Sequence, residues 1–356
     1  MAVRKGLAVA VVGATGAVGT EMLRALHERK FPVGRLRLLA SARSAGKRLQ
    51  FNGSSYRVEK LEKRSFDGVD VALFSAGANR SLEFAPEAVK RGAIVVDNSS
   101  AFRMKPEIPL VVPEVNPHAL RGHQGLIANP NCSTIIMLVA LKPLHDAARI
   151  TRITVATYQS VSGAGARAIW QLLVETKRAL SIAARGSRLN QDAVIKPFVK
   201  HEDVRVLPKQ IAFNVIPQID LFQENAYTKE EMKMVYETRK ILEEPALPVS
   251  ATCVRVPVFM AHSEAIWIQT ERKLSPNEAR QLLAKAPGVR VVDNPRKQRY
   301  PTPLDAAGSD DVLVGRIRVD ESVERGLALW VSGDNLRKGA ATNAIQIAEL
   351  LFRRGT

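Results

Sequence analysis

The chain is poor in cysteine and in aromatic residues, and it lacks any long apolar run. Two cysteines in 356 residues cannot build the disulfide framework of a small secreted domain, so we expect a reducing compartment, the cytoplasm. The first apolar run, residues 7–12, ends at a glycine turn and is too short for a signal-peptide core or a membrane span. No other run reaches the length of a membrane helix, so we expect no membrane partner.

Acidic residues are also few compared with basic ones. Lys and Arg number 52 and Asp and Glu 35, which leaves a net charge of +17. Such a balance is compatible with nucleic-acid binding or with an enzyme that has polyanionic ligands. Residues 24–64 hold twelve Lys and Arg against three Glu, and so carry +9 of this charge. The segment does not interleave aromatics with its cations and has no known nucleic-acid module, so we expect no nucleic-acid partner.

Strand and helix patterns alternate in the first part of the chain, whose length predicts about two domains in all. Strand-length apolar runs occupy residues 7–12, 36–39, 69–74 and 93–96, with helical patterns at 18–29 and 82–91. Buried strands separated by helices predict an α/β domain, a doubly wound parallel sheet of the Rossmann type.

The pattern changes near residue 150, where longer strands begin to alternate polar and apolar residues. Strands are predicted at residues 151–159, 211–216, 251–258, 265–270 and 327–332, and helices at 166–184, 228–242 and 276–286. These predict an α+β domain on a mixed or antiparallel sheet. Residues 184–210 show no clear helix or strand periodicity, so we expect a long excursion there, at the surface or at a subunit contact.

The last helical pattern, residues 337–354, is apolar on one face and is expected to return to the first domain. The predicted nucleotide-binding domain therefore comprises residues 1–131 and 335–356. Residues 132–334 would form an inserted catalytic and dimerisation domain.

A glycine-rich turn follows the first predicted strand and precedes the first predicted helix. Gly13, Gly16 and Gly19 form a G-x-x-G-x-x-G variant of the dinucleotide fingerprint. Glycines allow a tight turn and a close approach of backbone N–H groups to a pyrophosphate, and the helix N-terminus adds positive potential. The candidate cofactor contacts in this turn are Gly13, Thr15, Gly16, Ala17 and Val18.

The end of the second predicted strand favours NADP over NAD. An NAD site usually has an acid there for the ribose hydroxyls, but no acid occurs between residues 29 and 58. Arg43 lies there instead, between Ser41 and Ser44, and a guanidinium with two hydroxyls suits a 2′-phosphate. The alternative is a solvated basic loop, which would leave the missing acid unexplained.

Cys132 is the candidate nucleophile. It follows Pro130, which disfavours helix before it, and Asn131, a good helix N-cap, so Cys132 would lie in the first helical turn. Free N–H groups and the helix dipole would lower its pKa and favour the thiolate. A small buried residue at a helix start remains an equal alternative from position alone. Cys253 lies inside a strand pattern and is expected to be structural.

A histidine base would be expected beside the thiol, and His262 is the first candidate because it lies in a connection between two predicted strands. The other histidines are His27, His118, His123, His145 and His201. We expect no metal site.

Seven motifs in order and spacing carry a family resemblance. They are residues 13–19 (GATGAVG), 99–103 (SSAFR), 129–133 (NPNCS), 159–165 (QSVSGAG), 255–257 (RVP), 262–264 (HSE) and 334–341 (DNLRKGAA). Together they resemble the aspartate-semialdehyde dehydrogenase family over nearly the whole chain.

The resemblance implies that L-aspartyl 4-phosphate and NADPH give aspartate 4-semialdehyde, phosphate and NADP. Cys132 would attack the acyl phosphate and form a thioester, His262 would serve as general acid and base, and Gln159 would orient the substrate. The further cofactor contacts implied are Ser162, Gly163 and Asn335. The implied assembly is a homodimer, or a homotetramer formed by pairing dimers.

The charges of the substrate suggest partners within the same resemblance. Arg103 and Lys233 would bind the phosphate, Arg255 the α-carboxylate and Glu230 the ammonium, with Asn131 as a further contact. Thr228 and Glu231 read as a capping box, which leaves Glu230 free for the ligand.

The alternative enzyme is an N-acetyl-γ-glutamyl-phosphate reductase. Its substrate has no free ammonium and needs no acid such as Glu230. The alternative of another class is a basic nucleic-acid-binding protein on a Rossmann-type scaffold.

Overall fold

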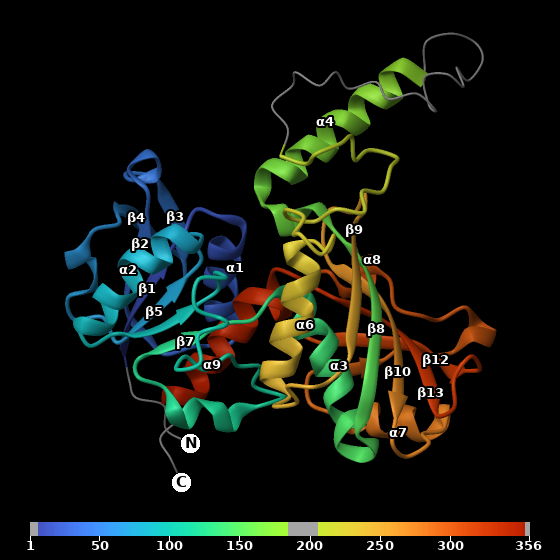
Figure 1. The fold of residues 1–356 in the computed structure, drawn as a ribbon. Coiled ribbons are helices and arrows are strands. Elements are labelled where there is room, and N and C mark those ends of the chain that lie inside the picture. The colour runs from blue at the N-terminus through green and yellow to red at the C-terminus, as the bar shows by residue number, and fades with distance from the viewer. Residues whose placement is uncertain (1–5, 184–205, 353–356) are drawn as a thin grey trace.

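Seven strands form the sheet of the first domain, in the order β3-β4-β2-β1-β5-β6-β7 (Figure 1). The computed structural model describes residues 6–183 and 206–352. The strands are β1 (Leu7–Val12), β2 (Val33–Ala40), β3 (Arg48–Phe51), β4 (Ser54–Lys60), β5 (Val71–Phe74), β6 (Ile94–Asp97) and β7 (Leu126–Ala128). All neighbouring pairs are parallel except β3 with β4.

Helices cover both faces of this sheet because alternate strand residues are buried on opposite sides. Val9 and Val11 of β1 belong to one apolar cluster with α1 (Ala17–Glu28) and α9 (Thr342–Phe352). Ala10 and Val12 belong to another cluster, which contains residues of α2 (Ala78–Lys90). The predicted doubly wound Rossmann-type fold is therefore confirmed.

The second domain contains a six-stranded mixed sheet in the order β11-β12-β13-β10-β8-β9. The strands are β8 (Ile150–Gln159), β9 (Val249–Arg255), β10 (His262–Thr270), β11 (Val289–Val291), β12 (Val312–Asp320) and β13 (Gly326–Gly333). The helices are α3 (Cys132–Ala148), α4 (Ala166–Ala183), α6 (Lys229–Ile241), α7 (Pro276–Lys285) and the short α8 (Pro303–Ala306). Pairs β8–β9 and β11–β12 are parallel and the others antiparallel, as the predicted mixed sheet requires.

One apolar core joins the two domains through α3. The buried residues of α3, such as Ile135 and Ile136, lie in the same cluster as Phe74 of the first sheet and Val331 of the second. The nucleophile candidate at the start of this helix is therefore fixed relative to both sheets.

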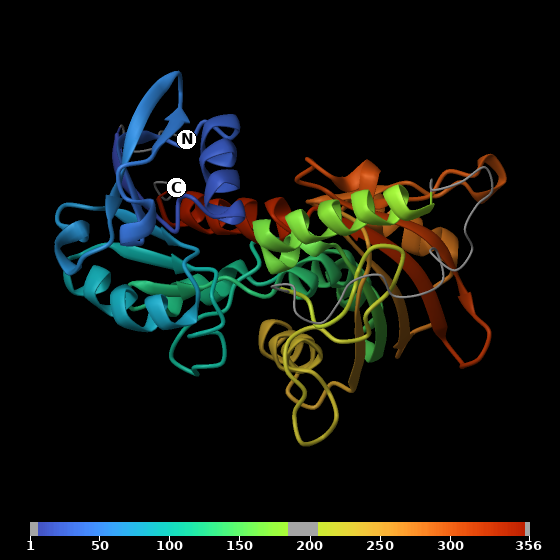
Figure 2. The same ribbon diagram turned by 90° about the horizontal axis from the view of Figure 1, so that it is seen from above.

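The C-terminal segment packs on the first domain. A π-helical turn, Arg337–Ala341, precedes α9, and Ala344 and Ile345 are buried in the cluster that contains α1. Figure 2 shows this segment leading back to the first domain. The division into residues 1–131 with 335–356 and an inserted domain of residues 132–334 stays a prediction.

The strand predicted at residues 211–216 is wrong. The Glu175 side chain of α4 accepts hydrogen bonds from the backbone N–H groups of Ile211 and Ala212, at 2.8 and 3.0 Å. Phe213 then has a φ of 58°, which ends any extended conformation. The apolar residues of this segment pack under α4 instead.

Several elements were not predicted, namely the short strands β3, β7 and β11, the longer strands β4 and β12, and the full extent of α3. The expected excursion at 184–210 lies, up to residue 205, outside the described residues. None of the described helices is long and apolar enough to cross a membrane.

Candidate active site

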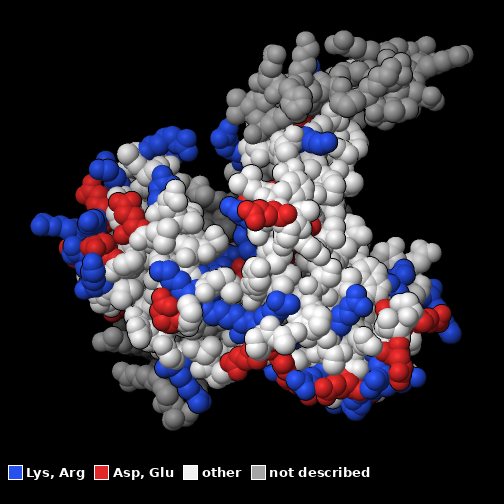
Figure 3. Space-filling view, viewed as in Figure 1, with Lys and Arg blue, Asp and Glu red and all other residues white. Residues whose placement is uncertain are grey.

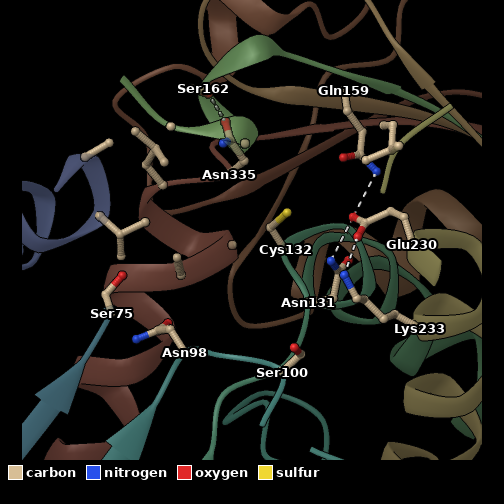
Figure 4. A pocket seen from close by; sticks show the side chains of 18 of the residues that line it. Ser75, Asn98, Ser100, Asn131, Cys132, Gln159, Ser162, Glu230, Lys233 and Asn335 are labelled. Atoms are coloured by element: carbon tan, nitrogen blue, oxygen red, sulfur yellow. Dashed lines mark hydrogen bonds and ion pairs between the residues drawn. The ribbon is translucent and has the colours of Figure 1, made fainter. Parts of the chain in front are cut away.

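A cavity of about 520 Å³ lies between the two domains. Lys and Arg side chains gather in the hollow between the domains on the face drawn in Figure 3. The thiol of Cys132 points into the centre of the cavity (Figure 4). Predicted residues that line it are Gly16, Ala17, Val18, Arg103, Asn131, Cys132, Gln159, Ser162, Gly163, Glu230, Lys233, Arg255 and Asn335.

The glycine-rich turn forms the nucleotide side of this cavity. Gly13 has a φ of 85°, and a Cβ there would lie 2.2 Å from the Ser75 carbonyl oxygen, so only glycine fits. Gly16 caps α1 without a side-chain hydrogen bond, which leaves first-turn N–H groups available to an anion. The residues present therefore fit a dinucleotide pyrophosphate.

The residues predicted to bind the 2′-phosphate, Ser41, Arg43 and Ser44, lie outside the cavity and directly after β2. Arg43 is exposed, and in the part of the chain that the structure describes it forms no ion pair. The Ser44 hydroxyl accepts a hydrogen bond from Thr15 at 3.2 Å, which ties this end to the glycine turn. Glu59 is the first acidic residue after α1, and its carboxylate accepts hydrogen bonds from Arg37. No free carboxylate is therefore available here to bind the ribose hydroxyls of NAD.

Cys132 is the first residue of α3, as predicted, and the Asn131 side chain caps the helix through the Ser133 and Thr134 N–H groups at 3.0 and 3.3 Å. The expected low pKa is wrong for this structure. Burial raises the pKa of the Cys132 thiol to about 12, and the Glu230 carboxylate adds to the rise. The opposing effects of nearby guanidinium groups and of the Ser133 N–H are smaller.

His262 was predicted to lie in a connection between two strands, and this is wrong. The strand β10 begins three residues earlier than predicted, and His262 is its first residue. Its Nδ1 accepts hydrogen bonds from the backbone N–H of Ser160 at 3.1 Å and from the Ser160 hydroxyl at 3.0 Å. Because the backbone group can only donate, the proton of the neutral ring lies on Nε2. Burial lowers the pKa of His262 to about 3, and the Arg255 charge acts in the same direction.

Glu230 is the centre of a polar cluster beside the thiol (Figure 4). It accepts hydrogen bonds from Asn131 at 2.8 Å and Gln159 at 3.4 Å, and it pairs with Lys233 at 3.1 Å. Burial alone would raise the pKa of Glu230, but the Lys233 charge and the Asn131 amide outweigh burial and lower that pKa. The predicted capping box of Thr228 and Glu231 is present, so Glu230 is free to face the cavity.

The two arginines of the cavity differ in how fully they are engaged. Arg103 donates to the Asn98 and Asn129 carbonyls and pairs with Glu237 at 3.0 Å. Arg255 donates from one terminal nitrogen to the Ser160 carbonyl at 2.7 Å, whereas its buried Nε has no partner. A buried donor without a partner is costly, so Arg255 is ready for an anionic ligand.

Asn335 and Gly163 complete the wall between the nucleotide turn and His262. Asn335 Oδ1 accepts hydrogen bonds from the Ser162 hydroxyl and from the Ala261 N–H, both at 3.0 Å, and it lies 3.2 Å from the Ser160 hydroxyl oxygen. A Cβ on Gly163 would lie 3.3 Å from His262 Nε2, so a larger residue would crowd the ring.

Sequence reasoning missed several cavity residues. Ser75 and Asn98 directly follow β5 and β6, and the rule that ligands lie at the carboxyl ends of parallel strands could have found them. Ser100 and Gly339 also line the cavity. A Cβ on Gly339 would lie 2.9 Å from Cys132 Cβ, so the π-helical turn presses directly against the nucleophile. The described residues include no group of His, Cys, Asp or Glu placed to hold a metal ion.

Comparisons with known proteins define the class first. The NAD-binding domain of semialdehyde dehydrogenases matches residues 8–123, and their dimerisation domain matches residues 141–338. Together with the cavity, these matches define a semialdehyde dehydrogenase with a dinucleotide-binding domain.

Comparisons over nearly the whole chain identify the particular family within this class. Aspartate-semialdehyde dehydrogenase of Aquifex aeolicus is 54% identical over 98% of this chain and 99% of its own, and that of Bacillus subtilis is 51% identical over 98% of each. The crystal structure of aspartate semialdehyde dehydrogenase II of Vibrio cholerae, complexed with ASA, superposes with a TM-score of 0.90 at 49% identity and covers 98% of both chains. The chain belongs to the aspartate-semialdehyde dehydrogenase family. These comparisons favour neither the reductase nor the nucleic-acid-binding alternative.

Proposed function

We propose that this chain reduces L-aspartyl 4-phosphate to L-aspartate 4-semialdehyde with NADPH, releasing phosphate, through a thioester on Cys132. The observation that carries the proposal is the single cavity in which the dinucleotide turn, Cys132 and a set of opposite charges meet. The product would serve the biosynthesis of lysine, threonine, methionine and isoleucine.

The charges of the cavity support this substrate. Arg255, with its free buried Nε, would bind the α-carboxylate as a bidentate partner. Glu230 carries negative charge and would bind the α-ammonium, which an N-acetylated substrate does not offer. Arg103 and Lys233 would bind the phosphate, with the Asn131 and Gln159 amides beside the acyl group.

Thioester formation needs no free thiolate at the start. The Cys132 sulfur forms a bond to the acyl carbon, the bond from that carbon to the phosphate oxygen breaks, and the thiol proton leaves with the phosphate. A thiol pKa of about 12 fits such a coupled transfer, because the thiolate is scarce before the substrate binds.

We propose that His262 acts as a hydrogen-bond donor in the reduction. The nicotinamide cofactor supplies the hydride when it is bound. The thioester carbonyl oxygen then gains negative charge, and the Nε2–H of the neutral His262 ring would stabilise it by donating a hydrogen bond while the ring keeps its proton. Collapse of this adduct breaks its C–S bond and releases the aldehyde, and the Cys132 sulfur regains a proton from solvent.

We propose NADP as the cofactor, with Ser41, Arg43 and Ser44 at its 2′-phosphate. The exposed Arg43 and the engagement of Glu59 by Arg37 support this choice. A related structure, that of aspartate semialdehyde dehydrogenase from Candida albicans, contains NADP and superposes with a TM-score of 0.74 at 26% identity, covering 98% of both chains. The two unpaired cysteines support action in the cytoplasm.

We propose a homodimer, which the dimerisation-domain match supports. Helix α4 projects away from the body of the chain (Figure 1). Trp170, Leu173 and Val174 are 65%, 47% and 46% exposed on it, and such apolar exposure is typical of an interface. Sedimentation at several concentrations would test this assembly, including the homotetramer.

The substrate assignment is tested in the oxidative direction. Phosphate-dependent NADP reduction is measured with L-aspartate 4-semialdehyde and with N-acetyl-glutamate semialdehyde as separate substrates. We expect activity with the first alone, since Glu230 would lack its ammonium partner with the second. Activity confined to the N-acetylated substrate would overturn the proposal.

A further inference from the structure

A second cavity adjoins the active site and has no part in the mechanism so far. It measures about 790 Å³ and is hereafter the outer cavity. Its walls are one face of α6, the loop at Met104 and the loop at Phe222. Ser100, Arg103 and Lys233 line both cavities, so these three residues form the junction between them.

The residues of the junction indicate which part of the substrate lies there. Arg103 and Lys233 are the proposed phosphate partners, and both lie at the junction. Arg255, Glu230 and the nucleotide turn line the inner cavity but not the outer one. The phosphate end of the substrate would thus face the outer cavity, whereas the amino-acid end and the nucleotide occupy the inner side.

The outer cavity offers a cation for an anion that leaves the junction. Lys229 precedes Lys233 by one helical turn and lines the outer cavity on the same face of α6. Lys233 is paired with Asp220 and Glu230, and Arg103 with Glu237. Lys229 is exposed and, within residues 6–183 and 206–352, has no ion-pair partner. The exposed Glu224 also lines the outer cavity, and its negative charge would counteract the attraction of Lys229 for an anion.

We propose that inorganic phosphate enters and leaves the active site through the outer cavity, with Lys229 as its first cationic contact and Glu224 as a charge that limits its affinity. This inference rests on the proposed function. Its consequence is that phosphate exchanges while the nucleotide stays bound, because the two ligands use different sides of the cavity.

The test is the KM for phosphate in the oxidative reaction at saturating aspartate semialdehyde and NADP. Lys229→Gln should raise this KM about two- to fivefold, the effect of one exposed ion pair, and Glu224→Gln should lower it by a similar factor. The KM for NADP should not change in either variant. Lys273→Gln, an exposed lysine outside both cavities, is the matched control.

Ionic strength provides a second readout that a structural defect would not mimic. In the wild type the KM for phosphate should rise with added KCl, and this slope should flatten in Lys229→Gln. An unchanged phosphate KM in both variants, or equal changes in the KM values for phosphate and NADP, would overturn the proposed route. A wild-type enzyme that does not use phosphate at all would instead overturn the proposed function.

Discussion

The nucleotide end and the catalytic end of the cavity are built in opposite ways. The nucleotide turn is one continuous segment, and its partner residues Arg43 and Ser44 lie in the short turn directly after the next strand, β2. The catalytic end joins Cys132, Glu230 and Arg255 from α3, α6 and β9, and the buried His262 of β10 lies next to Gly163 of its wall. The first end is partly exposed and local in sequence, whereas the second is buried and long-range. Substitutions should therefore have mild effects at the nucleotide end and severe effects at the catalytic end.

Replacement of the nucleophile should produce the largest effect. Cys132→Ser is expected to lower turnover roughly a thousandfold or more, because the thioester route is lost. Binding of NADP, measured by fluorescence or calorimetry, should be unchanged, since the nucleotide turn is a separate segment. Cys253→Ala is the control, because that thiol is buried away from the cavity. Substantial turnover by Cys132→Ser would refute the covalent route.

Replacement of His262 should affect the rate more than binding. His262→Asn is expected to lower kcat about a hundredfold, the contribution of one positioned hydrogen-bond donor to a developing oxyanion, with little change in KM. Because the pKa of His262 is about 3, the ring stays neutral as the pH falls through 6.5. The kcat/KM profile of the wild type should therefore show no acid limb near pH 6.5. Such a limb, abolished in His262→Asn, would show that the ring titrates normally.

Replacement of Arg255 should mainly weaken substrate binding. Arg255→Leu is expected to raise the KM for aspartate semialdehyde about thirtyfold, because it removes a buried partner of the α-carboxylate. Arg255→Lys should recover only part of the affinity, since an ammonium cannot form the bidentate pair. Steady-state kinetics of both variants would measure this, and a loss confined to kcat would contradict the assignment.

The raised thiol pKa predicts slow alkylation of the free enzyme. Between pH 7 and 9 the rate of Cys132 modification by iodoacetamide should rise about tenfold per unit, without a plateau, because thiolate forms only near pH 12. Mass spectrometry of the labelled peptide distinguishes Cys132 from Cys253. If the alkylation rate instead reached a plateau below pH 8, the helix dipole would have a larger effect on the pKa of Cys132 than burial has.

The smallest effect is expected at the nucleotide end. Arg43→Ala should raise the KM for NADP about fivefold and leave that for NAD unchanged, because an exposed guanidinium contributes little to phosphate binding. Arg57→Ala, an exposed arginine of β4, is the matched control. A change of more than a hundredfold would contradict the contrast between the two ends of the cavity.

Much of the fold could be predicted because periodicity and turn chemistry are local. The Rossmann-type strands, α4, α6 and α7 lie where the patterns placed them, with ends shifted by a few residues. Residues 211–216 failed because a side chain of α4, far away in sequence, captures their backbone N–H groups. The short strands β3, β7 and β11 were missed since three or four residues carry too little pattern.

The basic segment at residues 24–64 also changed meaning in the structure. Arg29 pairs with Glu349 and Asp310, Arg37 with Glu59, and Lys60 with Glu62. Part of this charge is therefore already paired, and Arg43 is among the cations left for a ligand. Composition counts charges, but only the fold decides which of them are already paired.

The sequence by itself determined the glycine turn, the helix start at Cys132 and the capping box of α6, because each depends on residues adjacent in the chain. Only the tertiary structure decided the protonation of the reactive groups. The first turn of a helix favours a thiolate, but burial among distant residues raises the pKa of the Cys132 thiol to about 12 and lowers that of His262 to about 3. Desolvation depends on everything that surrounds a group in space, and no local motif contains that information.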